Sequence, residues 1–272
     1  MCQILISLDN PNANDLLETF FKQSYPTFLS YGHGILHQNS NVWSSYKNFK
    51  PPFLDETYKN MTISTNVIAH MRQIYTTNLT PHQIRNEHTM QNTQPYKYQN
   101  TFFMHHGDLF RTDSGKPLIF QTNYNQPVFK EHIDRLRSLI DTKLLQNIHG
   151  NTDSELMFHV FLHFFTLSHT PISNYRNSIA SSLRKTFTAL HKHGFQTASN
   201  IIIAHDNYIA FSNIYINNTD KLIKPLRLYI DKRNGINICS SKLIPGSVEV
   251  KQNVLYIYNI ISKRITLHNM QI

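Results

Sequence analysis

The chain has 272 residues, of which 40% are hydrophobic and 12% aromatic, and its formal net charge is +9. This length and apolar content suffice for a buried core, so the composition excludes a disordered or low-complexity protein. Two cysteines, Cys2 and Cys239, are too few for the disulfide framework of a small secreted domain, so we expect a reducing, cytoplasmic location.

The charge pattern bears on two further classes of partner. The positive net charge favours an anionic partner such as a nucleic acid, but lysines and arginines are spread thinly and no run exceeds two residues. The most apolar stretch, residues 156–167, is too short to cross a bilayer and contains two histidines. No basic region precedes an apolar one at the start, which argues against a signal peptide. Nucleic-acid binding is therefore the weaker hypothesis, and we expect no membrane partner.

The first hundred residues predict short strands, one helix and long polar segments. Leu16, Leu17, Phe20 and Phe21 recur at helical spacing after a proline. The expected elements are, in order, a buried strand at 3–8, a helix at 12–21, a glycine-bracketed strand at 31–36, a polar surface connection at 37–64, a strand at 65–71 and a long loop at 76–98. Long loops inside compact domains are often functional.

The rest of the chain predicts helices followed by strands. A strand at 101–106 ends at Gly107, and helices follow at 129–146, from Thr152, and at 173–193. Strands separated by turns then follow at 200–204, 207–213, 225–231, 235–240, 247–250, 253–260 and 263–268. This order predicts an α+β fold, with antiparallel sheets packed against helices, in a single domain spanning residues 1–272.

Cys2 follows only the initiator methionine. If an aminopeptidase removes Met1, Cys2 carries a thiol and a free α-amino group on the same residue. An α-amine titrates near ~8 and a thiol near ~8.5, so the amine can accept the thiol proton directly or through one water. The position therefore predicts a nucleophile with its own base, although a cysteine here can also be incidental.

Five short motifs follow one another along the first part of the chain. They are Met1-Cys2; Gly32-His33-Gly34-Ile35; Ala69-His70-Met71-Arg72; Asn92-Thr93-Gln94-Pro95 followed by His105-His106-Gly107-Asp108-Leu109; and Thr152-Asp153-Ser154-Glu155. In this order and spacing the chain resembles the class II glutamine amidotransferases, an N-terminal nucleophile hydrolase family. The resemblance is greatest to the stand-alone branch of γ-glutamyl hydrolases, and it covers residues 1 to about 165.

The resemblance implies both a fold and a reaction. The fold is a four-layer αββα sandwich of the N-terminal nucleophile hydrolase type, formed by one glutamine amidotransferase type 2 domain. The reaction is hydrolysis of glutamine or another γ-glutamyl amide through a glutamyl thioester on Cys2, which releases ammonia or an amine. The family chemistry uses no cofactor. Its implied partners are the small γ-glutamyl substrate and a separate ammonia-accepting or regulatory protein.

The resemblance also assigns roles to individual residues. Arg72 corresponds to the clamp for the substrate carboxylate, which a guanidinium binds through two hydrogen bonds; a surface ion pair is the alternative. Asp153 corresponds to the residue that holds the substrate α-ammonium, although Thr152-x-x-Glu155 also has the pattern of a helix capping box. The remaining expected substrate-binding residues are His70, Gln94 and Asp108.

Three positions depart from the family pattern. Gly107 is retained at the oxyanion hole, but His106 stands where the family has an asparagine, and an imidazole donates one N–H, or attracts an anion more strongly if protonated. Gln94 replaces a histidine before Pro95, and His33 replaces a tryptophan. These departures favour an alternative hypothesis, in which a catalytically impaired member binds a γ-glutamyl group or regulates a partner.

The chain has 16 histidines, and His70, His105 and His106 suggest a metal site. Side chains alternate along a strand, so His105 and His106 are expected on opposite faces of the sheet. No Cys/His spacing resembles that of a zinc site either. We therefore expect no metal.

Overall fold

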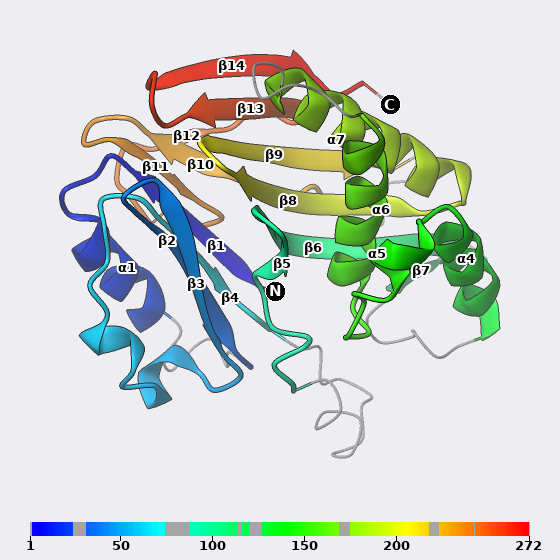
Figure 1. Cartoon of the computed structure of the whole chain (residues 1–272), viewed down its shortest axis with the longest axis horizontal. Helices are drawn as coiled ribbons and strands as arrows, with labels where there is room; N and C mark the ends of the chain where they lie inside the picture. Colours follow the sequence, from blue (N-terminus) through cyan, green and yellow to red (C-terminus); the bar gives the residue numbers. More distant parts are fainter. Residues whose placement is uncertain are drawn as a thin grey trace.

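The computed structural model describes residues 2–23, 31–73, 88–113, 116–119, 127–168, 175–217, 223–241 and 243–271. Two antiparallel sheets face each other, with helices on their outer sides (Figure 1). The first sheet has the strand order β12 (Val248–Glu249), β10 (Tyr229–Asp231), β11 (Ile236–Cys239), β1 (Gln3–Leu8), β4 (Val67–Met71), β2 (His33–Asn39) and β3 (Val42–Asn48).

The second sheet is built mainly from the later part of the chain. Its strand order is β14 (Arg264–Asn269), β13 (Val254–Asn259), β9 (Tyr208–Ile216), β8 (Gln196–His205), β6 (Thr101–Asp113) and β5 (Tyr96–Tyr98), with β7 (Lys116–Ile119) also paired to β6. Consecutive strands such as β8 and β9 form antiparallel hairpins, so neighbours in sequence are also neighbours in the sheet.

Helices cover the outer face of each sheet (Figure 1). The first sheet carries α1 (Ala13–Lys22) and the short helical turns η1 (Pro52–Leu54) and η2 (Tyr58–Asn60). The second sheet carries α6 (Asp153–Leu167) and α7 (Tyr175–Lys192), with α4 (Pro127–Ser138) and α5 (Thr142–Leu145) beside them. None of the helices in the described ranges combines the length and apolarity needed to cross a membrane.

Three buried apolar clusters fill the spaces between the four layers. Phe20 and Phe21 of α1 pack with Leu5 of β1 against the outer face of the first sheet. Ile4 and Ile6, which alternate with Leu5, point the other way into the cluster between the sheets. A third cluster joins the second sheet to α6 and α7. The α+β, four-layer αββα sandwich expected from the sequence is therefore confirmed.

Several element boundaries differ from the sequence prediction. The segment 37–64 is not only a surface connection, because β2 extends to Asn39 and β3 follows as an edge strand. A polar edge strand buries little on its open side, and along β3 the side chain of Trp43 is the one that is buried. The strand from Thr101 does not end at Gly107 but continues to Asp113.

The predicted helix at 129–146 is two helices, α4 and α5. Asp141 begins the second one, where its side chain accepts a hydrogen bond from the Lys143 N–H at 2.8 Å. The predicted long loop at 76–98 lies partly outside the described residues, and its last three residues form β5. The first two residues of the predicted helix at 173–193 also lie outside the described residues.

We predict that Gly34→Ala destabilises the protein. A Cβ at Gly34 would lie 1.9 Å from the carbonyl oxygen of Gln94 and 2.7 Å from Cδ of Pro95, so β2 and the 94–95 segment must separate. Overpacking of this kind costs about 1–3 kcal/mol in the free energy of unfolding, measured by urea denaturation. Ser45→Ala, at an exposed position on the neighbouring β3, is the control. Equal stability of the two variants would contradict the close approach.

Candidate active site

The apolar layer between the sheets becomes polar at one end. On the inner face of β1 the apolar Ile4 is followed toward this end by Cys2. On the inner face of β4 the apolar Ile68 is followed by His70 and then Arg72. The facing strands of the second sheet change in the same way, and β1 contacts β6 across the layer (Figure 1). The polar residues that these inner faces bring to one end are Cys2, His70, Arg72, His106, Asp108, Asn200 and Asn213.

Gln3 of β1 pairs with Met71 of β4. Because the strands are antiparallel, the residue before Gln3, which is Cys2, lies opposite the residue after Met71, which is Arg72. The Cys2 side chain is 9% exposed, and its Sγ accepts a hydrogen bond from the Gln73 N–H at 3.3 Å. Burial raises the pKa of the Cys2 thiol, although the Gln73 N–H and the Arg72 guanidinium act in the opposite direction. The thiol is therefore protonated near neutral pH, and its chemistry requires a base.

The Arg72 backbone is locked into the structure around it. Its N–H donates to the carbonyl oxygen of Gly32 at 2.8 Å, and its own carbonyl accepts from the Tyr31 N–H at 2.8 Å. Arg72 is 3% exposed, and its positive charge acts on both the Cys2 thiol and the buried His70. The structure thus brings the proposed nucleophile and the proposed carboxylate clamp together.

Asp108 lies on the inner face of β6. Its carboxylate raises the pKa of the Cys2 thiol further, so this negative charge also acts on Cys2. His70 is fully buried on β4, and burial, followed by the neighbouring His106, holds the pKa of His70 well below its ordinary value. These two predicted binding residues therefore belong to the same polar end of the layer as Cys2.

Asp153 is fully buried at the start of α6. One of its carboxylate oxygens accepts the Leu109 N–H at 2.9 Å, and the other accepts the Ser154 N–H at 2.7 Å. The carboxylate therefore ties the helix to β6 just beyond Gly107. The Ser154 hydroxyl lies 3.3 Å from the oxygen that accepts the Ser154 N–H, so it is the other oxygen, Oδ2, that keeps a second lone pair for a ligand.

The capping box predicted at Thr152 is half correct. The Thr152 hydroxyl accepts the Glu155 N–H at 3.1 Å, as an N-cap does. Glu155, however, does not reach back to the Thr152 N–H; its carboxylate accepts from the His149 N–H at 3.0 Å and the Gly150 N–H at 2.7 Å. The carboxylate therefore orders the turn that precedes the helix.

Gln94 holds its segment against β6. Its side-chain amide donates to the His105 carbonyl at 3.0 Å and accepts from the His105 N–H at 2.5 Å, as a neighbouring strand would.

His33, the third departure from the family pattern, faces the opposite side of the first sheet. Its ring packs against Phe21 and Tyr58, and its Nε2 lies 3.0 Å from the Asp55 carboxylate. The replacement at His33 is therefore remote from Cys2.

His105 and His106 face opposite sides of the second sheet, as strand alternation predicted. His105 points toward α6, with its ring nitrogens 2.8 Å from the Ser154 hydroxyl and 2.7 Å from the Ser199 hydroxyl. His106 points between the sheets, where its Nδ1 lies 3.2 Å from Nδ2 of Asn200. The three histidines proposed as a metal set therefore do not share one face.

His106 is neutral at physiological pH. Burial lowers its pKa to about 3, so the stronger attraction of a protonated ring does not apply. Gly107 beside it has φ +149°, and a Cβ there would lie 2.2 Å from the Ala198 carbonyl oxygen. Only glycine fits at this position.

Asn200 and Asn213 are inward-facing residues that the sequence reasoning missed. They lie on β8 and β9, where Asn200 pairs with Asn213 and both are buried. Asparagine is depleted in strands. Two asparagines at inner positions of an otherwise apolar hairpin were therefore an available signal.

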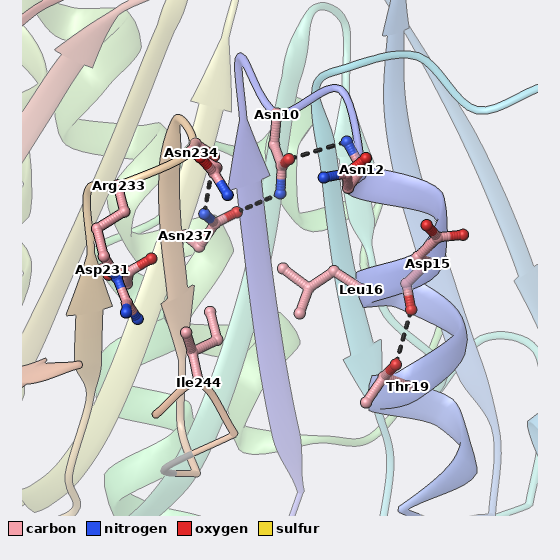
Figure 2. Close-up of a pocket in the computed structure, with 10 residues that line it drawn as sticks. All are labelled: Asn10, Asn12, Asp15, Leu16, Thr19, Asp231, Arg233, Asn234, Asn237 and Ile244. Atoms are coloured by element: carbon pink, nitrogen blue, oxygen red, sulfur yellow. Dashed lines mark hydrogen bonds and ion pairs between the residues drawn. The ribbon is translucent and has the colours of Figure 1, made fainter. Parts of the chain in front are cut away.

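A cavity of about 570 Å³ lies elsewhere, between α1 and the β11 region (Figure 2). It lies on the outer side of the first sheet and includes Asn10, which follows the end of β1 away from Cys2. Its lining asparagines bond to one another, since Asn10 donates to Asn237 at 2.9 Å and accepts from the Asn12 N–H at 2.9 Å. This cavity is separate from the candidate active site.

No family model matches the sequence, and no curated protein matches it either. Solved structures do match its fold. A glutamine aminotransferase class-II domain protein from Silicibacter pomeroyi superposes with a TM-score of 0.60 at 11% identity, covering 99% of each chain. The glutamine phosphoribosylpyrophosphate amidotransferase of B. subtilis gives a TM-score of 0.63 at 12% identity, covering 100% of this chain and 50% of that one. The chain therefore shares the fold of class II amidotransferase domains.

The lowered pKa of His106 predicts a pH-dependent stability. Between about 6.5, the ordinary value, and about 3, the unfolded chain binds a proton at His106 that the folded protein does not. The free energy of unfolding therefore falls as pH falls through this window, by about 2 kcal/mol between pH 6.5 and 5 for this group.

Urea denaturation at several pH values measures this contribution. We expect His106→Asn to have a shallower dependence, because that proton is removed. His149→Asn, the same substitution at an exposed histidine, is the comparison variant. An unchanged slope in His106→Asn would show that His106 titrates normally in the folded state.

Proposed function

We propose that the protein hydrolyses glutamine or another γ-glutamyl amide, with Cys2 as the nucleophile. The observation that carries the proposal is the position of Cys2 opposite Arg72, facing β6 residues 106–108 at the polar end of the inter-sheet layer. The shared fold of the class II amidotransferase domains supports it. The proposal covers γ-glutamyl amides as a class.

The reaction requires a chain from which an aminopeptidase has already removed Met1, which frees the α-amine of Cys2. This amine accepts the thiol proton, and the thiolate attacks the δ-carbonyl carbon of the substrate. The tetrahedral intermediate collapses to a thioester, and the leaving ammonia or amine takes the proton. A water molecule then attacks the thioester, releases glutamate and restores the thiol. The raised pKa of the Cys2 thiol explains why the step needs an adjacent base.

The charges around Cys2 match the two charged groups on the α-carbon of a glutamyl substrate. Arg72 binds the α-carboxylate, since a guanidinium offers two parallel N–H donors. We assign the α-ammonium to the carboxylates of Asp153 and Asp108: Oδ2 of Asp153 has a remaining lone pair, and the charge of Asp108 acts on Cys2. His70 and Gln94 complete the set, His70 as a buried ring close enough for His106 to act on it, and Gln94 by holding β6.

The oxyanion of the intermediate lies against residues 106 and 107 of β6. The Gly107 N–H and the His106 ring supply its hydrogen-bond donors. Removing one such donor from an enzyme lowers the rate by about 10²–10³-fold. The ammonia formed is released to water or to a separate acceptor protein, and a cytoplasmic location suits the free thiol.

A second candidate is a catalytically impaired protein that binds γ-glutamyl groups or regulates a partner. The buried, protonated thiol of Cys2 favours it, because a thiol without a base is a poor nucleophile. The two candidates share the assignment of Arg72 and Asp153 to the charged groups of the glutamyl substrate and differ in whether Cys2 turns over that substrate.

Cys2→Ala separates the two candidates. We expect it to abolish glutamate release from glutamine, a loss on the order of 10⁴-fold or more, because no other group replaces the nucleophile. The reference protein is one whose loss of Met1 has been verified by intact mass. Cys239→Ala removes the other cysteine, which packs on the outer face of the first sheet, and is the control. Equal rates for Cys2→Ala and the reference would reject the hydrolase proposal.

Arg72→Lys tests the carboxylate clamp. Lysine keeps the charge but loses the paired N–H geometry, so we expect KM for glutamine to rise by about 10–100-fold. The comparison substrate is 4-aminobutanamide, which has the amide and the ammonium but lacks the carboxylate. The unaltered protein should prefer glutamine strongly, and the variant should lose most of that preference. An equal effect on both substrates would mean that Arg72 acts through the fold.

A further inference from the structure

The orientation of the Asn213 side chain is determined by a backbone carbonyl. Its Nδ2 lies 2.6 Å from the carbonyl oxygen of Leu226, which can only accept a hydrogen bond. The nitrogen assignment is therefore the one that satisfies this contact. The same Nδ2 donates to Oδ1 of Asn200 at 2.9 Å.

Asn200 is determined in turn by two independent contacts. Its Oδ1 accepts from Asn213, and its Nδ2 donates to the carbonyl oxygen of Arg227 at 2.9 Å. The nitrogen side of this amide is thus the side that lies 3.2 Å from Nδ1 of His106. An amide NH₂ group only donates, so Nδ1 of His106 accepts and carries no hydrogen.

A neutral imidazole carries a single N–H, so in His106 it is on Nε2. The neutral state follows from burial, which lowers the pKa of His106 to about 3. Nε2 is buried and has no hydrogen-bond partner among the residues that the structure describes. Buried N–H groups without a partner are rare in proteins, because leaving one unpaired costs free energy.

We propose that Asn200, oriented by Asn213, is a positioning residue that fixes the tautomer of His106 so that its Nε2–H is presented between the sheets as a hydrogen-bond donor. This inference rests on the proposed function for the acceptor, which is the oxyanion formed when Cys2 attacks a γ-glutamyl carbonyl. The opposite tautomer would present a lone pair to the developing negative charge and would repel it.

The contacts from Asn213 to Asn200 and from Asn200 to His106 explain how a histidine can donate a hydrogen bond at position 106. A carboxamide offers its N–H without any choice of tautomer, whereas an imidazole offers one only if its other nitrogen is held as an acceptor. Asn200 imposes that condition. The carbonyls of Leu226 and Arg227, in the segment before β10, accept hydrogen bonds from the two asparagines and hold them in place. His106 and Asn200 therefore act as one unit.

The tautomer can be measured directly by NMR with ¹⁵N-labelled histidine, without any activity. His106→Gln assigns the signals of His106 by their disappearance. We expect a neutral ring with hydrogen on Nε2 in the unaltered protein. In Asn200→Asp the carboxylate can only accept, so the hydrogen should move to Nδ1. Hydrogen on Nδ1 in the unaltered protein, or no change in Asn200→Asp, would overturn the inference.

A double-mutant cycle tests the catalytic consequence. Asn200→Asp should lower kcat for glutamine hydrolysis by about 10²–10³-fold, with a smaller effect on KM. His106→Asn has no tautomer to fix, so adding Asn200→Asp to it should cost little further activity. Full additivity of the two losses would show that Asn200 acts only through the fold and would overturn the inference.

The two readouts separate this inference from the proposed function. If the unaltered protein has hydrogen on Nε2 but releases no glutamate, the tautomer assignment stands and the hydrolase proposal fails. If it releases glutamate while its His106 carries the hydrogen on Nδ1, the hydrolase proposal stands and the role of Asn200 is rejected.

Discussion

The antiparallel register of β1 and β4 determines where the candidate groups lie. Gln3 opposite Met71 places Cys2 opposite Arg72, and the apolar residues that follow Cys2 on the same face are buried between the sheets. A shift of one residue would turn Ile4 and Ile6 out of that layer, together with Cys2. The free energy of core packing therefore also holds the thiol and the guanidinium in place.

Burial sets the charge state of the site. It raises the pKa of the Cys2 thiol and lowers that of His106, so both groups are neutral near pH 7. Arg72 and Asp108 supply the opposite charges that act on the thiol. In such a buried setting an oriented neutral N–H interacts strongly with a developing anion, while a protonated thiol needs a base close to it before it can act as a nucleophile. We propose that the α-amine of a processed Cys2 supplies the base and that the oriented ring of His106 supplies the N–H.

Much of this arrangement could be predicted from local patterns. Periodicity placed α1 and α6 within a few residues, and strand alternation separated His105 from His106. The family resemblance in motif order predicted that Cys2 and Arg72 serve one site. The structure places them close together, because they lie at the ends of two strands that pair.

The parts that could not be predicted depend on pairing and on tertiary contacts. The polar β3 is a strand because it pairs along one edge with β2, which its own sequence does not reveal. The Gln94 amide is committed to the His105 backbone, and Glu155 bonds to the turn before its helix. Asn200 and Asn213 meet through the β8–β9 hairpin, and their orientation depends on carbonyls from another part of the chain.

Trapping the acyl intermediate tests the central claim most directly. The protein lacking Met1 is mixed with glutamine, quenched in acid within a turnover and digested, and the peptide that begins at Cys2 is weighed by mass spectrometry. The account predicts a glutamyl group bound to the Cys2 sulfur that hydroxylamine removes. Glutamate release with the Cys2 peptide unmodified throughout the time course would contradict it.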